Sequence, residues 1–460
     1  MRTSRRRFLA ACLAVPPGLL LTGCAVPRRQ EGAAHAADPD EATLVVGAAD
    51  GQLPARFLGL SYEKGDLRGG TLFHGGNTEL AHWFDRLGPG NLRIGGNSAD
   101  RTGWKGIGGI AGRSLQPSDV DALAAFVRLT SWNVLYGLNL ATSTPQAAAD
   151  EAAHAASRLG DRLAAFEIGN ECDLYGKHYF PDWTLTRFEQ RWADFRAAIL
   201  ARVPGAVLSG PASATHVKDW TVPFALGRPG GEIALLTQHY YAGNGKDPRV
   251  TVAELLGRDG HFRDTVCMPL HHAARARGIP FRLGEINSLY DGGRRGISDR
   301  FASALWVLQA MTTLAACGGA GVNLHGGNRG AYTPIANVGG TVLGPRPIYG
   351  GLLLFAQLGV GERQACHWDR ARPAIHALAV AGRDGLRTLL LNTNPQRALR
   401  VAVRLPGEVA ALQINGIAAT PLDAQTVLPA ELGQVRRDAD GAFRMNLPAN
   451  AAWVLRPAQG

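Results

Sequence analysis

Two glutamates lie in short motifs whose residue types suit acid/base chemistry. Glu171 ends the motif Phe-Glu-Ile-Gly-Asn-Glu at residues 166–171, and Glu285 lies in Phe-Arg-Leu-Gly-Glu-Ile-Asn at residues 281–287. Each motif follows an apolar run, so each carboxylate is expected where a buried strand emerges into solvent. Two such carboxylates, 114 residues apart in the chain, predict cleavage of a glycosidic bond, one serving as general acid/base and the other as nucleophile.

Two neighbouring residues are expected to assist them. Asn170 is placed to donate a hydrogen bond to a sugar 2-hydroxyl, a contact that tightens as the oxocarbenium-like transition state develops. Tyr240, at the end of the sixth expected strand, is expected to hydrogen-bond the nucleophile. The alternative is a surface glutamate, a turn asparagine and a packing tyrosine, and the matching positions of the two glutamates at strand ends argue against it.

The elements that must position these residues follow an alternating pattern of apolar runs and amphipathic segments. The apolar runs are residues 57–62, 91–95, 133–140, 163–169, 206–210, 233–240, 280–284 and 319–324. Near-continuous apolar strands separated by helices indicate a parallel sheet covered on both faces. Eight of them predict an α/β fold of the (β/α)8 TIM-barrel type, spanning residues 57–360, with Glu171 and Glu285 at the carboxyl-terminal rim.

The last hundred residues have a different pattern. Short apolar runs at 374–380, 386–392, 400–404, 412–414, 443–446 and 452–456 are separated by turn residues. This spacing predicts a C-terminal β-sandwich over residues 361–460. Residues 43–46 have the same character, so the segment 43–56 is expected to add an N-terminal strand to that sandwich.

The N-terminus has the features of an export signal. Arg5, Arg6 and Arg7 precede an apolar stretch that is too short for a comfortable membrane span, and Leu-Thr-Gly-Cys at 21–24 resembles a lipoprotein box. We therefore expect a twin-arginine signal peptide at 1–23, lipid attachment to Cys24, a flexible tether at 24–42, and a periplasmic or outer-membrane-anchored lipoprotein. The alternative is an ordinary signal peptide with an incidental cysteine.

Composition sets limits on the partners. The 460 residues are 46% hydrophobic and 19% charged, and removing the four signal arginines lowers the formal net charge from +10 to +6. A mild positive excess suits an anionic polysaccharide, while the absence of a basic stripe or recognition motif argues against nucleic acid. Cys172, Cys267, Cys317 and Cys366 lack metal-binding spacing. No metal or organic cofactor is expected, because two carboxylates and water complete a double displacement.

An ordered set of motifs resembles a known family. The motifs are Leu58-Gly-Leu-Ser-Tyr-Glu63, Leu92-Arg-Ile-Gly-Gly96, Ile168-Gly-Asn-Glu-Cys-Asp-Leu-Tyr175, Gln238-His-Tyr-Tyr241, Leu283-Gly-Glu-Ile-Asn-Ser-Leu-Tyr290 and Gly330-Ala-Tyr-Thr-Pro334. Over about residues 43–460 the chain resembles the retaining glycosidases of clan A, and within them glycoside hydrolase family 79, which contains β-glucuronidases and heparanases. The resemblance implies that Glu171 is the acid/base and Glu285 the nucleophile.

The same resemblance implies a uronate pocket. Glu63, Ser98 and Asp100 fall where the family grips sugar hydroxyls. Tyr290, Tyr332 and the backbone around Ala331 match positions that receive the sugar carboxylate. The chain departs from the family at Cys172, where a proline commonly follows the acid/base, and this puts the conformation of that loop in doubt.

The sequence therefore predicts a retaining β-glucuronidase that removes terminal glucuronic acid from oligosaccharides or polysaccharides. Its rivals are an endo-β-glucuronidase that cuts within heparan sulfate-like chains, a clan A glycosidase acting on neutral sugars, and a glycan-binding lipoprotein without catalysis. Retention predicts that the two carboxyl groups approach to about 5–5.5 Å, whereas about 6.5–9.5 Å would indicate inversion.

Overall fold

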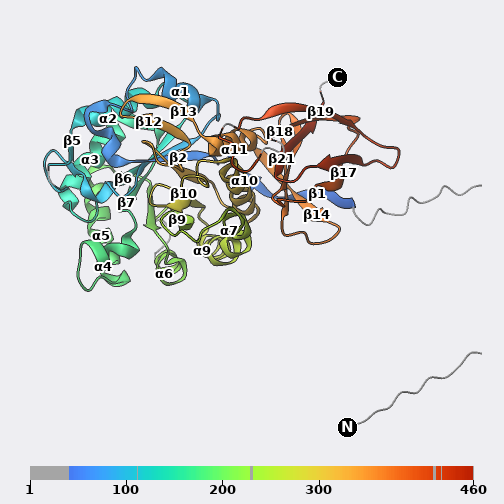
Figure 1. Ribbon diagram of the computed structural model, residues 1–460. Coiled ribbons are helices and arrows are strands. Elements are labelled where there is room, and N and C mark those ends of the chain that lie inside the picture. The colour runs from blue at the N-terminus through green and yellow to red at the C-terminus, as the bar shows by residue number, and fades with distance from the viewer. Residues whose placement is uncertain (1–40, 111, 228–231, 418–420, 426, 459–460) are drawn as a thin grey trace, which may run out of the picture. The chain divides into compact units, whose positions relative to one another are not determined.

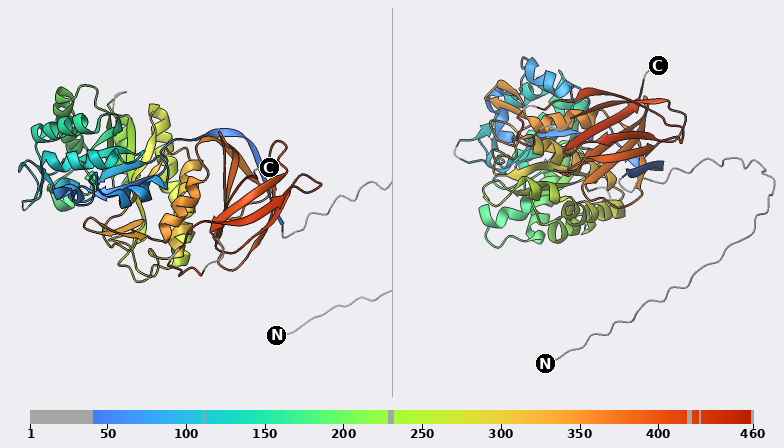
Figure 2. Two further views of the ribbon diagram at one scale, coloured as in Figure 1. Left: turned by 90° about the horizontal axis from the view of Figure 1, so that it is seen from above. Right: turned by 45° about the vertical axis from the view of Figure 1, so that its right-hand side comes forward.

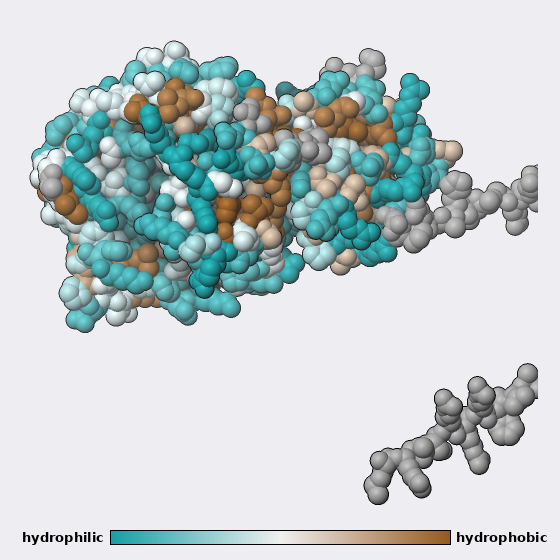
Figure 3. Space-filling view, viewed as in Figure 1, coloured by the Kyte–Doolittle hydropathy of each residue, from teal (hydrophilic) through white to brown (hydrophobic). Residues whose placement is uncertain are grey.

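A computed structural model describes residues 41–460 except 111, 228–231, 418–420, 426, 459 and 460. The expected signal peptide, Cys24 and the tether up to residue 40 lie outside these residues. Residues 41 and 42, expected to belong to the tether, instead begin the strand β1 (Glu41–Leu53). Among the described helices, none is both long and apolar enough to cross a membrane. Exposed apolar side chains on the face seen in Figure 3 form scattered patches among polar ones.

Eight parallel strands close into a barrel, which confirms the (β/α)8 prediction (Figure 1). In barrel order they are β2 (Gly59–Glu63), β3 (Asn91–Gly95), β6 (Asn133–Leu138), β7 (Leu163–Ile168), β8 (Leu208–Ser213), β9 (Leu235–Asn244), β10 (Phe281–Tyr290) and β11 (Val322–His325). Closure occurs where β11 pairs with β2, with Leu324 opposite Leu60. Because the strands are parallel, all their carboxyl ends reach one rim, where barrel enzymes build their active sites.

Helices surround this barrel, and residue types typical of helix N-termini mark where they begin. The main ones are α1 (Thr78–Asp85), α2 (Pro117–Val127), α3 (Pro145–Leu159), α5 (Leu185–Arg202), α6 (Val222–Gly227), α9 (Met268–Arg277), α10 (Phe301–Ala316) and α11 (Pro347–Ala356). The side chain of Thr144 accepts from Ala147 N at 3.2 Å to cap α3, and Pro145 occupies its first turn. Helix α10 is buried along nearly its whole length, as expected of a helix that is apolar on every side.

The floor of the barrel is held by a buried arginine. Arg282 on β10 donates to Asn323 Oδ1 at 2.6 Å and to the carbonyl oxygens of Phe57 and Val322 at 3.2 and 2.8 Å. Burial lowers the pKa of Arg282 to about 9. Its acceptors are neutral, so this arginine links strands at the amino-terminal end rather than serving chemistry.

The second region is a nine-stranded sheet. In order its strands are β19 (Ala430–Arg436), β18 (Ala411–Ile417), β21 (Ala451–Pro457), β16 (Gly385–Asn392), β15 (Ile375–Gly382), β14 (Gly361–Trp368), β1, β17 (Leu399–Arg404) and β20 (Phe443–Leu447). Figure 2 shows β1, in blue, among these orange and red strands. It pairs antiparallel with β14 and parallel with β17.

This arrangement refines the expected sandwich. The hydrogen bonding is continuous through all nine strands instead of being split between two sheets, because β1 bridges β14 and β17 and β21 bridges β16 and β18. The sheet nevertheless encloses a core of its own. Leu44, Val401 and Phe443 from one wing share a cluster with Leu412, Trp453 and Leu455 from the other, so the sheet curls over itself.

Candidate active site

A cavity of about 980 Å³ opens at the carboxyl-terminal ends of the barrel strands. Its lining includes Glu63, Asn97, Arg101, Glu171, Lys177, Lys218, His239, Tyr240, Tyr241, Glu285, Tyr290, Asp291, His325 and Tyr332. The two glutamates singled out by the sequence therefore face one space. The volume is at the upper end of ordinary ligand pockets, which are about 300–1,000 Å³.

Glu171 lies on a tight turn after β7. Its backbone is left-handed (φ 50°, ψ 46°), a conformation that a non-glycine residue adopts at a cost. Gly169 precedes it at φ +88°, where a Cβ atom would lie 2.5 Å from the Cys172 sulfur and 2.9 Å from the Tyr175 hydroxyl. Asp100 Oδ2 accepts from Asn170 N at 3.0 Å. The glycine and this buried carboxylate hold the turn that presents Glu171.

Glu285 lies inside a strand rather than at its end. Strand β10 continues to Tyr290, so the expected strand end at 284 was wrong. Glu285 Oε2 accepts from Arg93 Nη1 at 2.8 Å and Oε1 accepts from the Tyr241 hydroxyl at 2.7 Å. Burial alone would raise the pKa of Glu285, but the positive charges of His325 and Arg93 and the bond from Tyr241 outweigh it and hold this pKa well below its usual range.

Arg93 on β3 is the hub of the site. It is fully buried and donates to Glu167 Oε2 at 2.6 Å, to Glu285 Oε2 at 2.8 Å and to Asn170 Oδ1 at 2.9 Å. The fixed fork of the guanidinium thereby links the turn that carries Glu171 to Glu285. In the sequence, the signal for this hub is an arginine within an otherwise apolar strand, and Arg93 was not among the expected site residues.

His239 on β9 connects the same arginine to Glu171. Arg93 Nη2 lies 3.1 Å from His239 Nε2, and His239 Nδ1 lies 3.3 Å from Glu171 Oε1. Because arginine only donates, Nε2 must accept, and the ring proton therefore lies on Nδ1, facing the carboxylate. One ring nitrogen of His239, one carboxylate oxygen of Glu171 and one of Glu285 all lie within 4.8 Å of one another. The two carboxylates are thus close across the cavity.

That trio has the spacing of a metal site, but its hydrogen bonds suit another role. One Glu285 oxygen is bonded to Arg93 and the other to Tyr241. The Nδ1 of His239 carries a proton, so it has no lone pair for a metal. A cation here would also lie next to the guanidinium. The donor set fits two carboxylates with separate acid and nucleophile roles better than it fits a metal ion.

A second histidine, on β11, lies between two carboxylates on the other side of Glu285 from His239. His325 Nε2 is 3.6 Å from Glu63 Oε1, and Nδ1 is 3.6 Å from Glu285 Oε2. Burial lowers the pKa of His325, but Glu285 and Glu63 overcome it, and the net direction is upward. Glu63 also accepts from the backbone N–H groups of Asn97 and Ser98 at 3.2 and 2.7 Å. Glu63 thus lines the cavity in a fixed orientation.

The tyrosine that bonds Glu285 is Tyr241, the neighbour of the expected Tyr240. Tyr240 packs on Phe262 with ring centroids 4.3 Å apart, whereas Tyr241 donates to Glu285. Successive side chains on a strand point to opposite faces, so Tyr241 shares the face of His239 and Tyr240 does not. The motif contained both residues, and only the register between β9 and β10 decides which one meets Glu285.

Three residues expected to contact sugar make hydrogen bonds within the protein. Asp100 is buried and accepts from the backbone N–H groups of Leu140, Ala141 and Asn170 and from the Tyr175 hydroxyl at 2.5 Å. These bonds to both of its oxygens shape the turn that carries Glu171.

The other two of these residues lie in loops. The hydroxyl oxygen of Ser98 accepts from Gly65 N at 2.8 Å, and its backbone N–H goes to Glu63. The N–H of Ala331 donates to Gly292 O at 2.7 Å, and that of Tyr332 donates to the same oxygen at 3.4 Å. This stretch of backbone is therefore turned toward the loop after β10 and not toward a sugar carboxylate.

The remaining expected residues do lie at the cavity or beside it. Tyr290, with 45% of its surface exposed, and the largely enclosed Tyr332 both line the cavity, and their ring centroids lie 6.3 and 6.2 Å from that of Tyr241. The side-chain oxygen of Asn170 accepts from Arg93, which leaves the side-chain NH₂ group as the donor for a ligand.

The thiol of Cys172, where the resembling family commonly has proline, is fully buried beneath the acid/base turn. Burial raises its pKa well above the ordinary value, so it remains a neutral thiol. Its carbonyl oxygen accepts from Trp183 Nε1 at 2.8 Å. Cys172 thus fills space under Gly169 and does not act as a nucleophile in this geometry.

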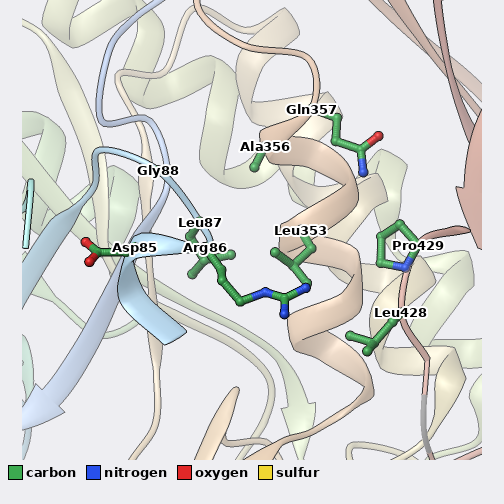
Figure 4. Close-up of a pocket in the computed structure, with 9 residues that line it drawn as sticks. All are labelled: Asp85, Arg86, Leu87, Gly88, Leu353, Ala356, Gln357, Leu428 and Pro429. Atoms are coloured by element: carbon green, nitrogen blue, oxygen red, sulfur yellow. The ribbon is translucent and has the colours of Figure 1, made fainter. Parts of the chain in front are cut away.

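Another hollow lies beside α11 and lacks the chemistry of the first. Figure 4 shows Arg86 reaching toward Leu353 on α11, with Leu428 and Pro429 opposite and Asp85 pointing away. Its volume is about 430 Å³. With a single carboxylate directed elsewhere, it offers no pair of catalytic groups.

Comparison with known proteins gives partial sequence matches. No protein-family model matches the chain. A β-glucuronidase of Aspergillus niger is 28% identical over 227 residues, which cover 44% of this chain and 42% of the relative. A β-glucuronidase of Neurospora crassa is 27% identical over 219 residues, covering 42% and 39%. The matches thus span less than half the length of these curated relatives.

Solved structures match over nearly the whole chain. A 4-O-α-L-rhamnosyl-β-D-glucuronidase from Fusarium oxysporum has a TM-score of 0.75 at 16% identity, covering 90% of this chain and 100% of its own. The α-L-arabinofuranosidase of Thermotoga maritima has a TM-score of 0.71 at 16% identity, covering 90% and 99%. The chain therefore has the fold of barrel glycoside hydrolases that carry an additional β-sheet region.

Proposed function

We propose that this protein is a retaining β-glucuronidase of the glycoside hydrolase family 79 type, with Glu171 as acid/base and Glu285 as nucleophile. The observation that carries the proposal is the approach of these two carboxylates to within 4.8 Å, nearest oxygen to nearest oxygen, in one cavity at the barrel mouth. This short separation favours retention, since an inverting enzyme must leave room for water between its carboxyl groups.

In the first step Glu285 attacks the anomeric carbon. Arg93 and Tyr241 keep Glu285 ionised and fix one lone pair of each oxygen, so the remaining lone pairs are available to the sugar. Glu171 gives its proton to the glycosidic oxygen as the bond breaks. A covalent glycosyl-enzyme with inverted configuration results.

In the second step Glu171 acts as base. It removes a proton from water, which attacks the anomeric carbon from the face that the leaving group has vacated. The bond between this carbon and Glu285 breaks as the bond to water forms, which frees the Glu285 carboxylate and gives a sugar of the original configuration. The Glu171 side chain is 20% exposed, compared with 6% for Glu285. That access suits a group that must exchange protons with solvent in each cycle.

Preference for a glucuronide has two supports. The first is the partial sequence match to the two fungal β-glucuronidases. The second is the pair of tyrosines, Tyr290 and Tyr332, at the cavity edge, because phenol hydroxyls can donate to a sugar carboxylate without adding a full counter-charge.

A substrate panel tests this proposal. The purified protein is offered 4-nitrophenyl β-D-glucuronide, the matching β-glucoside and the α-L-arabinofuranoside, and proton NMR follows the anomeric configuration of the first-formed product. We expect the glucuronide to be cleaved fastest and to give the β-anomer first. Preference for a neutral sugar would reject the glucuronide assignment, and the α-anomer as first product would reject the mechanism.

Endo action is a second candidate, and the size of the cavity favours it. At about 980 Å³ the cavity has room for sugar residues on more than one side of the scissile bond. Size analysis of products from heparan sulfate distinguishes the two modes. Release of glucuronic acid from chain ends identifies an exo enzyme, whereas rapid shortening of the chain without monosaccharide identifies an endo enzyme.

We also propose export by the twin-arginine route with lipid attached to Cys24, on the strength of the motifs at residues 4–9 and 21–24. Metabolic labelling with a fatty acid tests it in cells expressing the parent and the Cys24→Ala variant. Label in the variant equal to that in the parent would reject the anchor.

A further inference from the structure

The rim of the cavity is divided by charge. From the loops after β3, β7 and β8, which form one side together with Glu171, come Arg101, Lys177 and Lys218, along with His178, His216 and Asp219. From the loops after β2 and β10, which form the other side together with Glu285, come Glu63 and Asp291. The acid/base side is therefore basic, whereas the nucleophile side is acidic.

The cations on the acid/base side are available to a ligand. Lys177 lies in the last turn of the short helix α4 (Tyr175–His178), Lys218 lies on η5 (Val217–Thr221), and both are exposed. Within the described residues, neither lysine has an ion-pair partner, nor does Arg101. By contrast, Lys246 near the opposite side is 3.2 Å from Asp291. With three cations against the carboxylates of Asp219 and Glu171, the acid/base side thus carries net positive charge.

The loops that present these cations are well anchored. Asp173, directly after Cys172, accepts from the backbone N–H groups of Ala214 and Thr215 at 2.7 and 3.0 Å and from His216 Nδ1 at 2.8 Å. This carboxylate ties the loop after β8 to the acid/base loop after β7. Lys177 and Lys218 therefore belong to one connected wall of the cavity.

The proposed mechanism determines which part of the substrate contacts this wall. The proton donor must touch the glycosidic oxygen, so the departing group lies on the side of Glu171. We propose that this wall is a subsite for an anionic leaving group, in which a sulfate ester or a carboxylate next to the scissile bond is bound by Lys177, Lys218 and Arg101. The inference rests on the proposed function and adds the charge of the substrate on the side away from the glucuronic acid.

Matched substrates test the subsite. Phenyl β-D-glucuronides carrying a 3-sulfonate or a 3-carboxylate are compared with their neutral 3-sulfonamide and 3-carboxamide counterparts, which have a similar shape. We expect a higher kcat/KM for each anionic member. Because exposed charges are screened by salt, the preference should fall as the ionic strength rises from about 0.01 M to about 1 M, where the Debye length shrinks from ~30 to ~3 Å. The two arms show whether sulfonate or carboxylate is preferred.

Single-charge variants locate the effect. Lys177→Gln and Lys218→Gln should each reduce the preference roughly 1.4- to 5-fold, as expected for an exposed charge pair, and should leave the neutral substrates nearly unchanged. The matched control is Lys105→Gln, which removes one lysine that is paired with Asp150 at 2.8 Å outside the cavity. It should leave the preference unaltered.

The outcomes separate the two claims. Turnover of the neutral substrates without an anionic preference, or a preference that survives loss of both lysines, overturns the subsite while the proposed function stands. Failure to cleave all four glucuronides overturns the proposed function and the subsite with it.

Discussion

The two glutamates have the same side chain but very different surroundings. Glu285 lies within a strand, is 6% exposed, and has each oxygen bonded to a fixed donor. Glu171 lies on a strained turn, is 20% exposed, and is approached by His239 at 3.3 Å. These surroundings match the proposed roles: Glu285, the proposed nucleophile, accepts from fixed donors that favour its anion, whereas Glu171, the proposed acid/base, has access to water for proton exchange.

Removing the nucleophile is expected to have the largest effect. Glu285→Gln keeps the shape but cannot form the glycosyl-enzyme, so kcat on aryl β-glucuronides should fall on the order of 10⁴-fold or more. Steady-state kinetics measure this loss. Added azide should not restore retained product, whereas in Glu285→Ala it should enter the vacated space and give a glycosyl azide of inverted configuration. Near-parental activity in Glu285→Gln would exclude Glu285 as the nucleophile.

Removing the acid/base should cost less and should depend on the leaving group. Glu171→Gln is expected to lose about 10²–10⁴-fold on 4-nitrophenyl glucuronide. With 2,4-dinitrophenolate, which departs without protonation, the first step should be nearly unaffected, and pre-steady-state kinetics should show a burst as the intermediate accumulates. An equal loss with both leaving groups would show that Glu171 is not the proton donor.

Arg93 connects the two surroundings, and its loss should destabilise the fold. Arg93→Met leaves Glu167 and Glu285 buried without their cation, which should cost about 3–5 kcal/mol of unfolding free energy, measured by urea denaturation. Arg282→Met is the matched control, because it removes a buried arginine with neutral acceptors at the barrel floor. If Arg282→Met folds, its kcat/KM should keep the parental pH dependence, whereas the pH dependence of kcat/KM in Arg93→Met should change.

The two adjacent tyrosines test the assignment of the donor to Glu285. Tyr241→Phe removes a hydrogen bond to a buried anion, a loss of about 1.5–3 kcal/mol, so kcat/KM should fall roughly 10- to 150-fold. Tyr240→Phe removes a hydroxyl of a ring that packs on Phe262, and since the donor to Glu285 is Tyr241, it should change kcat/KM little. The reverse order of effects would contradict the register of β9.

The smallest expected effect is on pH dependence. Because the pKa of Glu285 is held below its usual range, the acid limb of kcat/KM should lie below the ordinary glutamate value of about 4.3. Tyr241→Phe should move this limb upward. The same shift means that ionised Glu285 stabilises the fold above its unfolded pKa and that this stabilisation disappears as the pH falls through the folded pKa. An acid limb that does not move in Tyr241→Phe would contradict this account.

Much of the fold could be predicted because its signal is local. The barrel strands are near-continuous apolar runs, and consecutive glycine, asparagine and glutamate residues indicate the turn that carries Glu171. Strand ends were less certain, since nothing local distinguishes the last buried residue of β10 from the residues that continue the strand past Glu285. Whether the C-terminal strands form one sheet or two depends on long-range pairing, such as that of β1 between β14 and β17.

The barrel, its order of strands and the two glutamates could be predicted from the sequence, because apolar periodicity and motif spacing are properties of neighbouring residues. The hydrogen-bond partners became visible only in the folded chain: Tyr241 in place of Tyr240, Arg93 as hub, and the bonds that Asp100, Ser98 and Ala331 make within the protein. The physical reason is that a hydrogen bond is short and directional. A shift of one residue in strand register reverses which side chains face the cavity.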